Sequence, residues 1–226
     1  MPRKFFQIGF NKCGTTSIAR FFKRNGFRCA NWECGKLARR LRQNLQENRF
    51  ILSGYEHYHA YTDMEHVTAQ DFCYGFMYYR QIFEQVEDAM FILNTRDKDN
   101  WVRSRLNHHI HGTNESYAAC YQAFYGLVDI SAVIERWRKE WDAHHAAVQE
   151  FIPPERLLVF NIETDSPLRL CEFAGLDDSA AQHYGHENIT FTEFGEFLRR
   201  RTPGIIKRAM PRRSRDAIKR LLRKRQ

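Results

Sequence analysis

The 226-residue chain lacks the features that mark membrane and secreted proteins. No apolar run approaches the roughly 18 to 20 residues that a membrane-spanning helix needs. Residues 1–11 contain no apolar segment of the kind that forms a secretory signal before the charged Lys12. The cysteines are scattered and form no CxxC pair, which argues against a disulfide framework or a cysteine zinc site. These absences predict a cytoplasmic protein with reduced cysteines and no bound metal.

Positive charge is concentrated at the end of the chain. Residues 199–226 hold 13 of the 35 Lys and Arg side chains but one of the 27 acidic ones. Apolar residues recur there at helical spacing, which predicts a basic amphipathic extension, 199–226, after a main domain, 1–198. The extension is interpreted as a solvated helix, a surface for an anionic ligand or acceptor, or an attachment to an anionic membrane or nucleic acid. We expect no nucleic-acid partner, and membrane contact stays open.

Short apolar runs alternate with amphipathic segments along the main domain. Strands are expected at residues 5–10, 27–32, 89–94 and 157–162. Helices are expected to begin near residues 15, 37, 99 and 134. Residues 51–75 have no sustained period and predict an irregular excursion that walls the acceptor site. The alternation predicts an α/β fold: a three-layer αβα arrangement around a mainly parallel sheet, P-loop NTPase-like, with its ligand at the carboxyl ends of the strands.

The loop after the first expected strand has the composition of an anion site. It contains Gly9 and Gly14, one cation, Lys12, and then three hydroxyl residues at the start of a helix. Backbone N–H groups of such a loop, with a helix N-terminus behind them, bind phosphate. A Walker A loop has its lysine directly after the second glycine, where this chain has Thr15. The displaced Lys12 suits a clamp on the leaving group of a transfer reaction.

Two motifs resemble those of sulfotransferases that use 3′-phosphoadenosine 5′-phosphosulfate (PAPS). The first, residues 12–17, matches K-x-G-T-[ST]-[ST], and in the second Arg96 ends a strand with Ser104 eight positions later. Lys98 stands where the family often has proline. The resemblance covers roughly residues 5–190. It implies that the 5′-phosphosulfate binds the loop and the 3′-phosphate binds Arg96 and Ser104. The implied nucleotide-binding residues are Asn11, Lys12, Cys13, Gly14, Thr15, Thr16, Ser17, Arg96 and Ser104.

The predicted reaction is in-line transfer of a sulfuryl group to a hydroxyl or amine, leaving adenosine 3′,5′-bisphosphate, with Lys12 stabilising the leaving oxygen. It requires no metal ion. A general base must approach the acceptor, and we expect Asp63 first, then His57 or His59. Glu33 is a further candidate, because it follows the second strand, where related carbohydrate sulfotransferases place a catalytic glutamate.

Two other functions remain open from the sequence. A small-molecule or nucleoside kinase would also use a P-loop, and a non-catalytic protein would bind a nucleotide or an anionic surface through the basic extension. For Arg96, the alternative to a phosphate contact is a surface ion pair with Asp97 or Asp99. The acceptor is expected to be a small molecule, a lipid or a saccharide, and its identity and the oligomeric state do not follow from the sequence.

Overall fold

The computed structural model describes residues 3–110 and 115–185, all of which belong to one compact unit, Met1–Glu187. The predicted basic extension, 199–226, lies outside the described residues. The strands are β1 (Lys4–Gln7), β2 (Cys29–Asn31), β3 (Ala60–Thr62), β4 (Glu65–Val67), β5 (Phe72–Tyr74), β6 (Ala89–Thr95) and β7 (Leu157–Asn161). The α-helices are α1 (Thr15–Arg24), α2 (Lys36–Gln46), α3 (Tyr79–Gln85), α4 (Lys98–Leu106), α5 (Tyr117–Tyr125), α6 (Ile130–Phe151) and α7 (Leu168–Ala174). Short 3₁₀ helices cover Gly75–Tyr78, Pro154–Arg156 and Asp178–His183.

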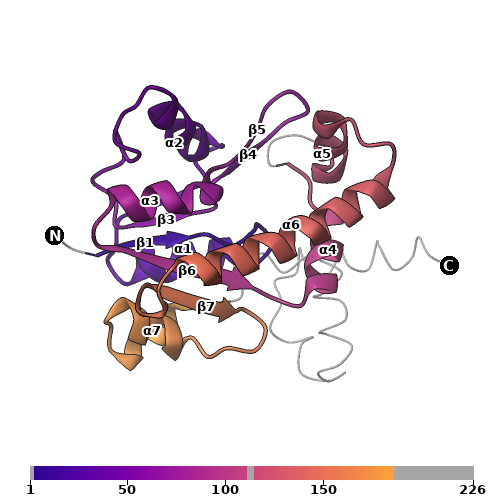
Figure 1. Ribbon diagram of the computed structural model, residues 1–226. Helices are drawn as coiled ribbons and strands as arrows, with labels where there is room; N and C mark the ends of the chain where they lie inside the picture. The colour runs from indigo at the N-terminus through magenta and orange to yellow at the C-terminus, as the bar shows by residue number, and fades with distance from the viewer. Residues whose placement is uncertain (1–2, 111–114, 186–226) are drawn as a thin grey trace, which may run out of the picture. The chain divides into compact units, whose positions relative to one another are not determined.

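Five strands form a parallel sheet in the order β2-β3-β1-β6-β7 (Figure 1). β4 and β5 form a separate antiparallel hairpin in which Glu65 pairs with Tyr74. All carboxyl ends of the five-stranded sheet therefore lie at one edge, and the loop between β1 and α1 begins there. The predicted mainly parallel α/β fold is confirmed.

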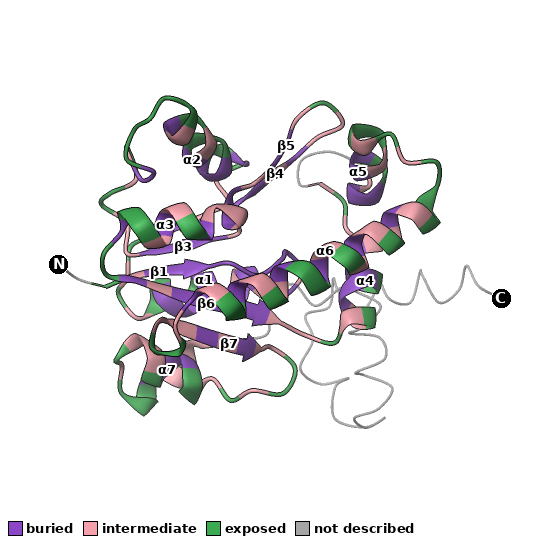
Figure 2. Cartoon of the chain, in the orientation of Figure 1, coloured by how far each residue is buried: buried purple, intermediate pink, exposed green. Residues whose placement is uncertain are grey.

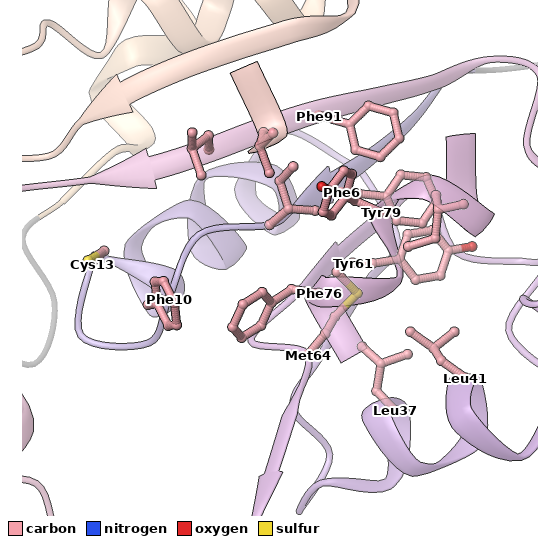
Figure 3. Packing of buried hydrophobic residues seen from close by; sticks show 14 of the residues in the cluster. Phe6, Phe10, Cys13, Leu37, Leu41, Tyr61, Met64, Phe76, Tyr79 and Phe91 are labelled. Atoms are coloured by element: carbon pink, nitrogen blue, oxygen red, sulfur yellow. The ribbon is translucent and has the colours of Figure 1, made fainter. Parts of the chain in front are cut away.

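Both faces of the sheet are covered, as the alternation of side chains along β1 shows. Phe5 packs on one face with residues of α1 and α7, whereas Phe6 packs on the other with residues of α3 and α6. The strands are largely buried, and the exposed positions are mostly on the helices and loops (Figure 2). Tyr61 stacks on Phe6 at 4.6 Å between ring centroids, in the core that also holds Leu37 of α2 (Figure 3). The arrangement is three-layered.

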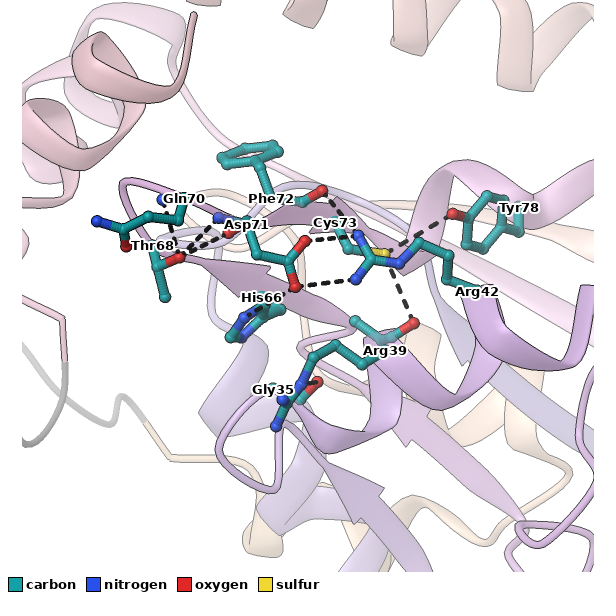
Figure 4. Close-up of polar contacts among 11 residues, drawn as sticks. Gly35, Arg39, Arg42, His66, Thr68, Gln70, Asp71, Phe72, Cys73 and Tyr78 are labelled. Carbon is teal, nitrogen blue, oxygen red and sulfur yellow. Dashed lines mark hydrogen bonds and ion pairs between the residues drawn. The ribbon is translucent and has the colours of Figure 1, made fainter. Parts of the chain in front are cut away.

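The prediction of an irregular excursion over residues 51–75 is wrong in part. β3 lies inside the sheet, between β2 and β1, with all three of its residues buried. A strand of three residues with both faces covered shows no alternation of polar and apolar side chains, so its sequence carries no period to detect. The hairpin β4–β5 follows at once, and Arg42 of α2 holds it by two hydrogen bonds to Asp71, at 2.7 and 2.9 Å (Figure 4).

No single helix among the described residues is long and apolar enough to cross a membrane. The pair Tyr117–Tyr125 and Ile130–Phe151, bent by 88°, passes the same length and composition test together, and the inward-facing residues of both helices are core residues.

Candidate active site

The loop between β1 and α1 turns through two residues in the left-handed region. Lys12 has φ 63° and Gly14 has φ 74°, and a β-carbon at Gly14 would lie 3.0 Å from the side chain of Ile162. α1 begins at Thr15 without a side-chain cap. The N–H groups of its first turn lie at the positive end of the helix dipole. This geometry suits an anion held above the start of α1.

Two buried amides fix the loop from beneath. Asn94 of β6 accepts hydrogen bonds from Gly9 N (2.8 Å) and Gln7 Nε2 (2.5 Å), and its Nδ2 donates to the carbonyls of Phe10 (3.3 Å) and Cys13 (2.8 Å). Gly9 must be glycine, because a β-carbon there would collide with the backbone and amide oxygens of Asn94. The loop is thus held by its neighbouring strand as well as by its own turn.

Asp63 directly follows β3 and lies at the carboxyl edge beside the loop. Its backbone N–H donates to Gln7 Oε1 at 2.8 Å, and its carboxylate accepts a hydrogen bond from the Thr15 hydroxyl. Burial raises the pKa of Asp63 to about 6, against the opposing effects of the Lys12 charge and the Thr15 hydrogen bond. A carboxylate with a pKa near 6 is ionised at neutral pH and still accepts a proton readily.

Arg96 lies against the same loop. Its Nη1 donates to the carbonyl oxygen of Lys12 at 3.2 Å, and its Nε and Nη2 donate to Glu163 at 3.0 and 2.7 Å. The observed ion pair is therefore with Glu163, not with the nearby Asp97 or Asp99. Ser104, the other residue of the second motif, is buried on α4. The structure brings the Arg96 guanidinium to the loop that carries Lys12.

Glu33 and the segment around His57 make their hydrogen bonds with residues outside this loop. The segment around His57 precedes β3 at the amino edge of the sheet, where Lys4 Nζ, at the start of β1, donates to the carbonyls of Glu56 and Tyr58 at 2.6 Å each. Glu33 follows β2 in a run of left-handed residues, Trp32 to Gly35, and accepts hydrogen bonds from Tyr55 (2.7 Å) and Tyr58 (3.3 Å). Its carboxylate is thus bound to the segment that precedes β3.

Sequence reasoning missed two titratable residues next to the loop. Burial, and then the charge of Lys12, lower the pKa of His108 to about 4, so its imidazole is neutral at neutral pH. Glu65, two residues after Asp63, accepts a hydrogen bond from the loop residue Asn11 at 2.5 Å. In the sequence, the clues that these two residues belong near the site were the position of His108 shortly after Ser104 and the position of Glu65 two residues after Asp63.

The loop also contains one cysteine, Cys13. Burial raises the pKa of the Cys13 thiol, so this loop cysteine is protonated and packs in the core (Figure 3). Across residues 3–110 and 115–185, no group of three or more His, Cys, Asp or Glu side chains is arranged to hold a metal ion. The positive charge at the loop comes from Lys12, Arg96 and the start of α1.

A glycine-containing loop at the carboxyl edge of a five-stranded parallel sheet, with its lysine ahead of the second glycine, defines a P-loop-like fold. A family model described as "Sulfotransferase domain" matches residues 4–191. The chain therefore belongs to this sulfotransferase family. A comparison with curated proteins finds no match.

Proposed function

We propose that the protein transfers the sulfuryl group of PAPS to a hydroxyl or amine of a small-molecule acceptor. Membership of the sulfotransferase family supports sulfuryl transfer by a transferase enzyme, and members of the family generally use this donor. The observation that carries the finer proposal is the hydrogen bond from Arg96 to the carbonyl of Lys12. It joins the two motifs that bind opposite ends of the same doubly phosphorylated adenosine.

The residues present suit this donor. Lys12 and the amides at the start of α1 would hold the 5′-phosphosulfate, and Arg96 with Ser104 would hold the 3′-phosphate, for which the guanidinium supplies charge and planar donors. Glu163 already occupies two of those donors, so binding requires the 3′-phosphate to share or replace this carboxylate. When bound, PAPS supplies a sulfuryl group whose bond to the 5′-phosphate breaks as its bond to the acceptor forms.

Asp63 is the proposed general base. Its carboxylate lies by Thr15 and within the field of Lys12, so a hydroxyl or amine approaching the loop passes its proton to Asp63 while Lys12 stabilises the departing phosphate oxygen. Glu33 and His57 have no part in this proposal, because the first is bound by Tyr55 and Tyr58 and the second lies at the other edge of the sheet.

The test is transfer activity and nucleotide binding with Lys12→Ala. We expect sulfate transfer to fall by about 100-fold or more, since removal of one oxyanion-stabilising donor has effects of this size. Lys36→Ala is the matched control, because Lys36 is likewise a lysine beside a helix start that has a left-handed glycine, and it is exposed. Equal activity of the two variants, or a preference of the wild type for ATP with Mg²⁺, contradicts the proposal.

Calorimetric titration separates the two ends of the nucleotide in the same experiment. Arg96→Ala should weaken the binding of adenosine 3′,5′-bisphosphate more than the binding of adenosine 5′-phosphate, because only the first nucleotide carries a 3′-phosphate. Equal losses for both nucleotides would assign Arg96 to support of the loop through its bond to Lys12.

A further inference from the structure

An enclosed polar network lies behind the loop and outside the proposed chemistry. Its members come from the loop, the β4–β5 hairpin, α4 and α5, and are Asn11, Glu65, Tyr74, Arg105 and Tyr117. Arg105 is 0% exposed, Glu65 is 6% exposed and Asn11 is 4% exposed. Two charged groups so far from water require a specific role or a partner.

The contacts in this network form a continuous chain from the loop to Arg105. Asn11 Nδ2 donates to Glu65 Oε1 at 2.5 Å, and the Tyr117 hydroxyl donates to Glu65 Oε2 at 3.4 Å. Arg105 Nη2 in turn donates to the hydroxyls of Tyr117 and Tyr74. Glu65 is thus the link between the residue before Lys12 and a buried cation.

Arg105 keeps its charge, because a guanidinium does not lose its proton in proteins. Aromatic faces surround it, with its Cζ 4.6 Å from the centroids of both Tyr117 and Trp137 and 4.9 Å from that of Trp101. Its Nε and Nη1, and Oδ1 of Asn11, have no hydrogen-bond partner within the described part of the chain. The network is therefore incompletely satisfied at its two ends, Asn11 and Arg105.

Several charged or titratable groups face Glu65 or its neighbour Asp63. Asp63 approaches from the end of β3, Arg105 from α4, Tyr117 from α5 and Tyr74 from β5, while Lys12 and His108 lie at the loop. Burial, and then the negative charge of Asp63, raise the pKa of Glu65 to about 8, opposed by Arg105 and by the hydrogen bonds from Asn11 and Tyr117. Burial and the repulsion between the two carboxyl groups therefore favour a proton on Glu65 more than on Asp63.

We propose that Glu65 is a positioning residue that holds Asn11 of the loop and takes up a proton when an anionic nucleotide binds. The inference rests on the proposed nucleotide site. A bound polyphosphate brings negative charge beside Lys12 and cancels much of the positive field there. An additional negative charge at Glu65 is then less favourable, so binding and protonation reinforce one another.

The other groups respond differently at pH 8. Burial raises the pKa of Tyr74 and of Tyr117 well above its ordinary value, so both stay neutral, and His108, with its pKa near 4, does not gain a proton. The phosphates of the nucleotide, whose second pKa is about 6, are already ionised. Uptake at pH 8 therefore reports mainly on Glu65, because Asp63 with a pKa near 6 contributes less.

The experiment titrates the full chain with adenosine 3′,5′-bisphosphate at pH 8 in two buffers of different ionisation enthalpy, which gives the number of protons bound. We expect the wild type to take up a fraction of a proton, on the order of one half. Glu65→Gln keeps an acceptor for Asn11 but cannot titrate, so its uptake should be much smaller. Between pH 7 and 9, the affinity of the wild type for the nucleotide should fall by about 3- to 10-fold more than the affinity of Glu65→Gln.

Asp71→Asn is the matched control on the same hairpin. The Arg42 hydrogen bonds lower the pKa of Asp71, so this carboxylate stays ionised throughout and its loss should leave the proton count unchanged (Figure 4). Tight binding without proton uptake by the wild type, or equal uptake by Glu65→Gln, overturns the inference. Absence of any binding by the wild type instead contradicts the proposed function. The wild-type measurement decides the question even where a variant does not fold.

Discussion

Replacement of Asn94 by alanine tests whether a buried amide, rather than the loop itself, maintains the anion site. Asn94 is fully buried and makes four hydrogen bonds to β1 and the loop. At about 1 kcal/mol net for each bond, Asn94→Ala should lower the free energy of unfolding by about 4 kcal/mol. That is a large part of the roughly 5 to 15 kcal/mol that stabilises a typical domain.

Asn44→Ala provides the comparison, because Asn44 is also fully buried and donates to the carbonyls of Ile51 (2.9 Å) and Ser53 (3.0 Å). It should cost about 2 kcal/mol and leave the loop unchanged. Urea unfolding measures both losses of stability. Titration of the folded variants with adenosine 3′,5′-bisphosphate measures nucleotide affinity, which reports on the conformation of the loop. We expect binding to weaken about tenfold or more in Asn94→Ala, equivalent to about 1.4 kcal/mol, and to be retained in Asn44→Ala.

Two results would refute this reasoning about Asn94. One is a stability loss no larger than that of Asn44→Ala, which would mean that water or a rearranged loop replaces the four bonds. The other is unchanged nucleotide affinity in a destabilised but folded Asn94→Ala protein, which would show that the loop keeps its conformation through its own turn at Lys12 and Gly14.

Two further predictions concern pH and metal. Burial raises the pKa of Asp63 to about 6 and that of Glu65 to about 8, above their unfolded values. The folded state therefore binds more protons at these two sites, and their contribution to the free energy of unfolding should fall as pH rises from about 4 to 8. Glu65→Gln should reduce the slope of unfolding free energy against pH by at most about 1.4 kcal/mol per pH unit. Identical slopes for the wild type and the variant in urea unfolding would contradict the raised pKa of Glu65. Sulfate transfer should persist in EDTA, because Lys12 and the loop amides supply the positive charge; loss of activity that Mg²⁺ restores would show otherwise.

Local signals in the sequence predict much of the fold. Thr15 begins α1 as expected, and Gly175, in the left-handed conformation, ends α7. These features depend on neighbours within a few residues, where capping and backbone preferences act. The long α6 and the strand β6 are likewise recognisable from their own apolar periods.

The polar supports of the site could not be predicted in the same way. Gln7 lies in an apolar strand and Asn94 in a continuous apolar run, and each bonds to residues in other elements, 85 positions apart in the case of Gly9 and Asn94. Arg105 is a charged residue on a short helix, yet it is fully buried among aromatic rings. Which polar side chain is buried depends on the packing of distant segments, and that information is absent from a single local pattern.

The choice of general base shows how the path of one short strand decides chemistry. His57, His59 and Asp63 lie within seven residues, and each has a side chain that can serve as a general base. β3 runs between them, and its three extended residues, at roughly 3.3 Å each, carry the chain about 10 Å from one edge of the sheet toward the other. Because β3 is parallel to β1, the residue after it shares an edge with the loop, whereas those before it lie by Lys4. Under the proposed function, Asp63 is therefore the member of this group that would meet an acceptor above Lys12.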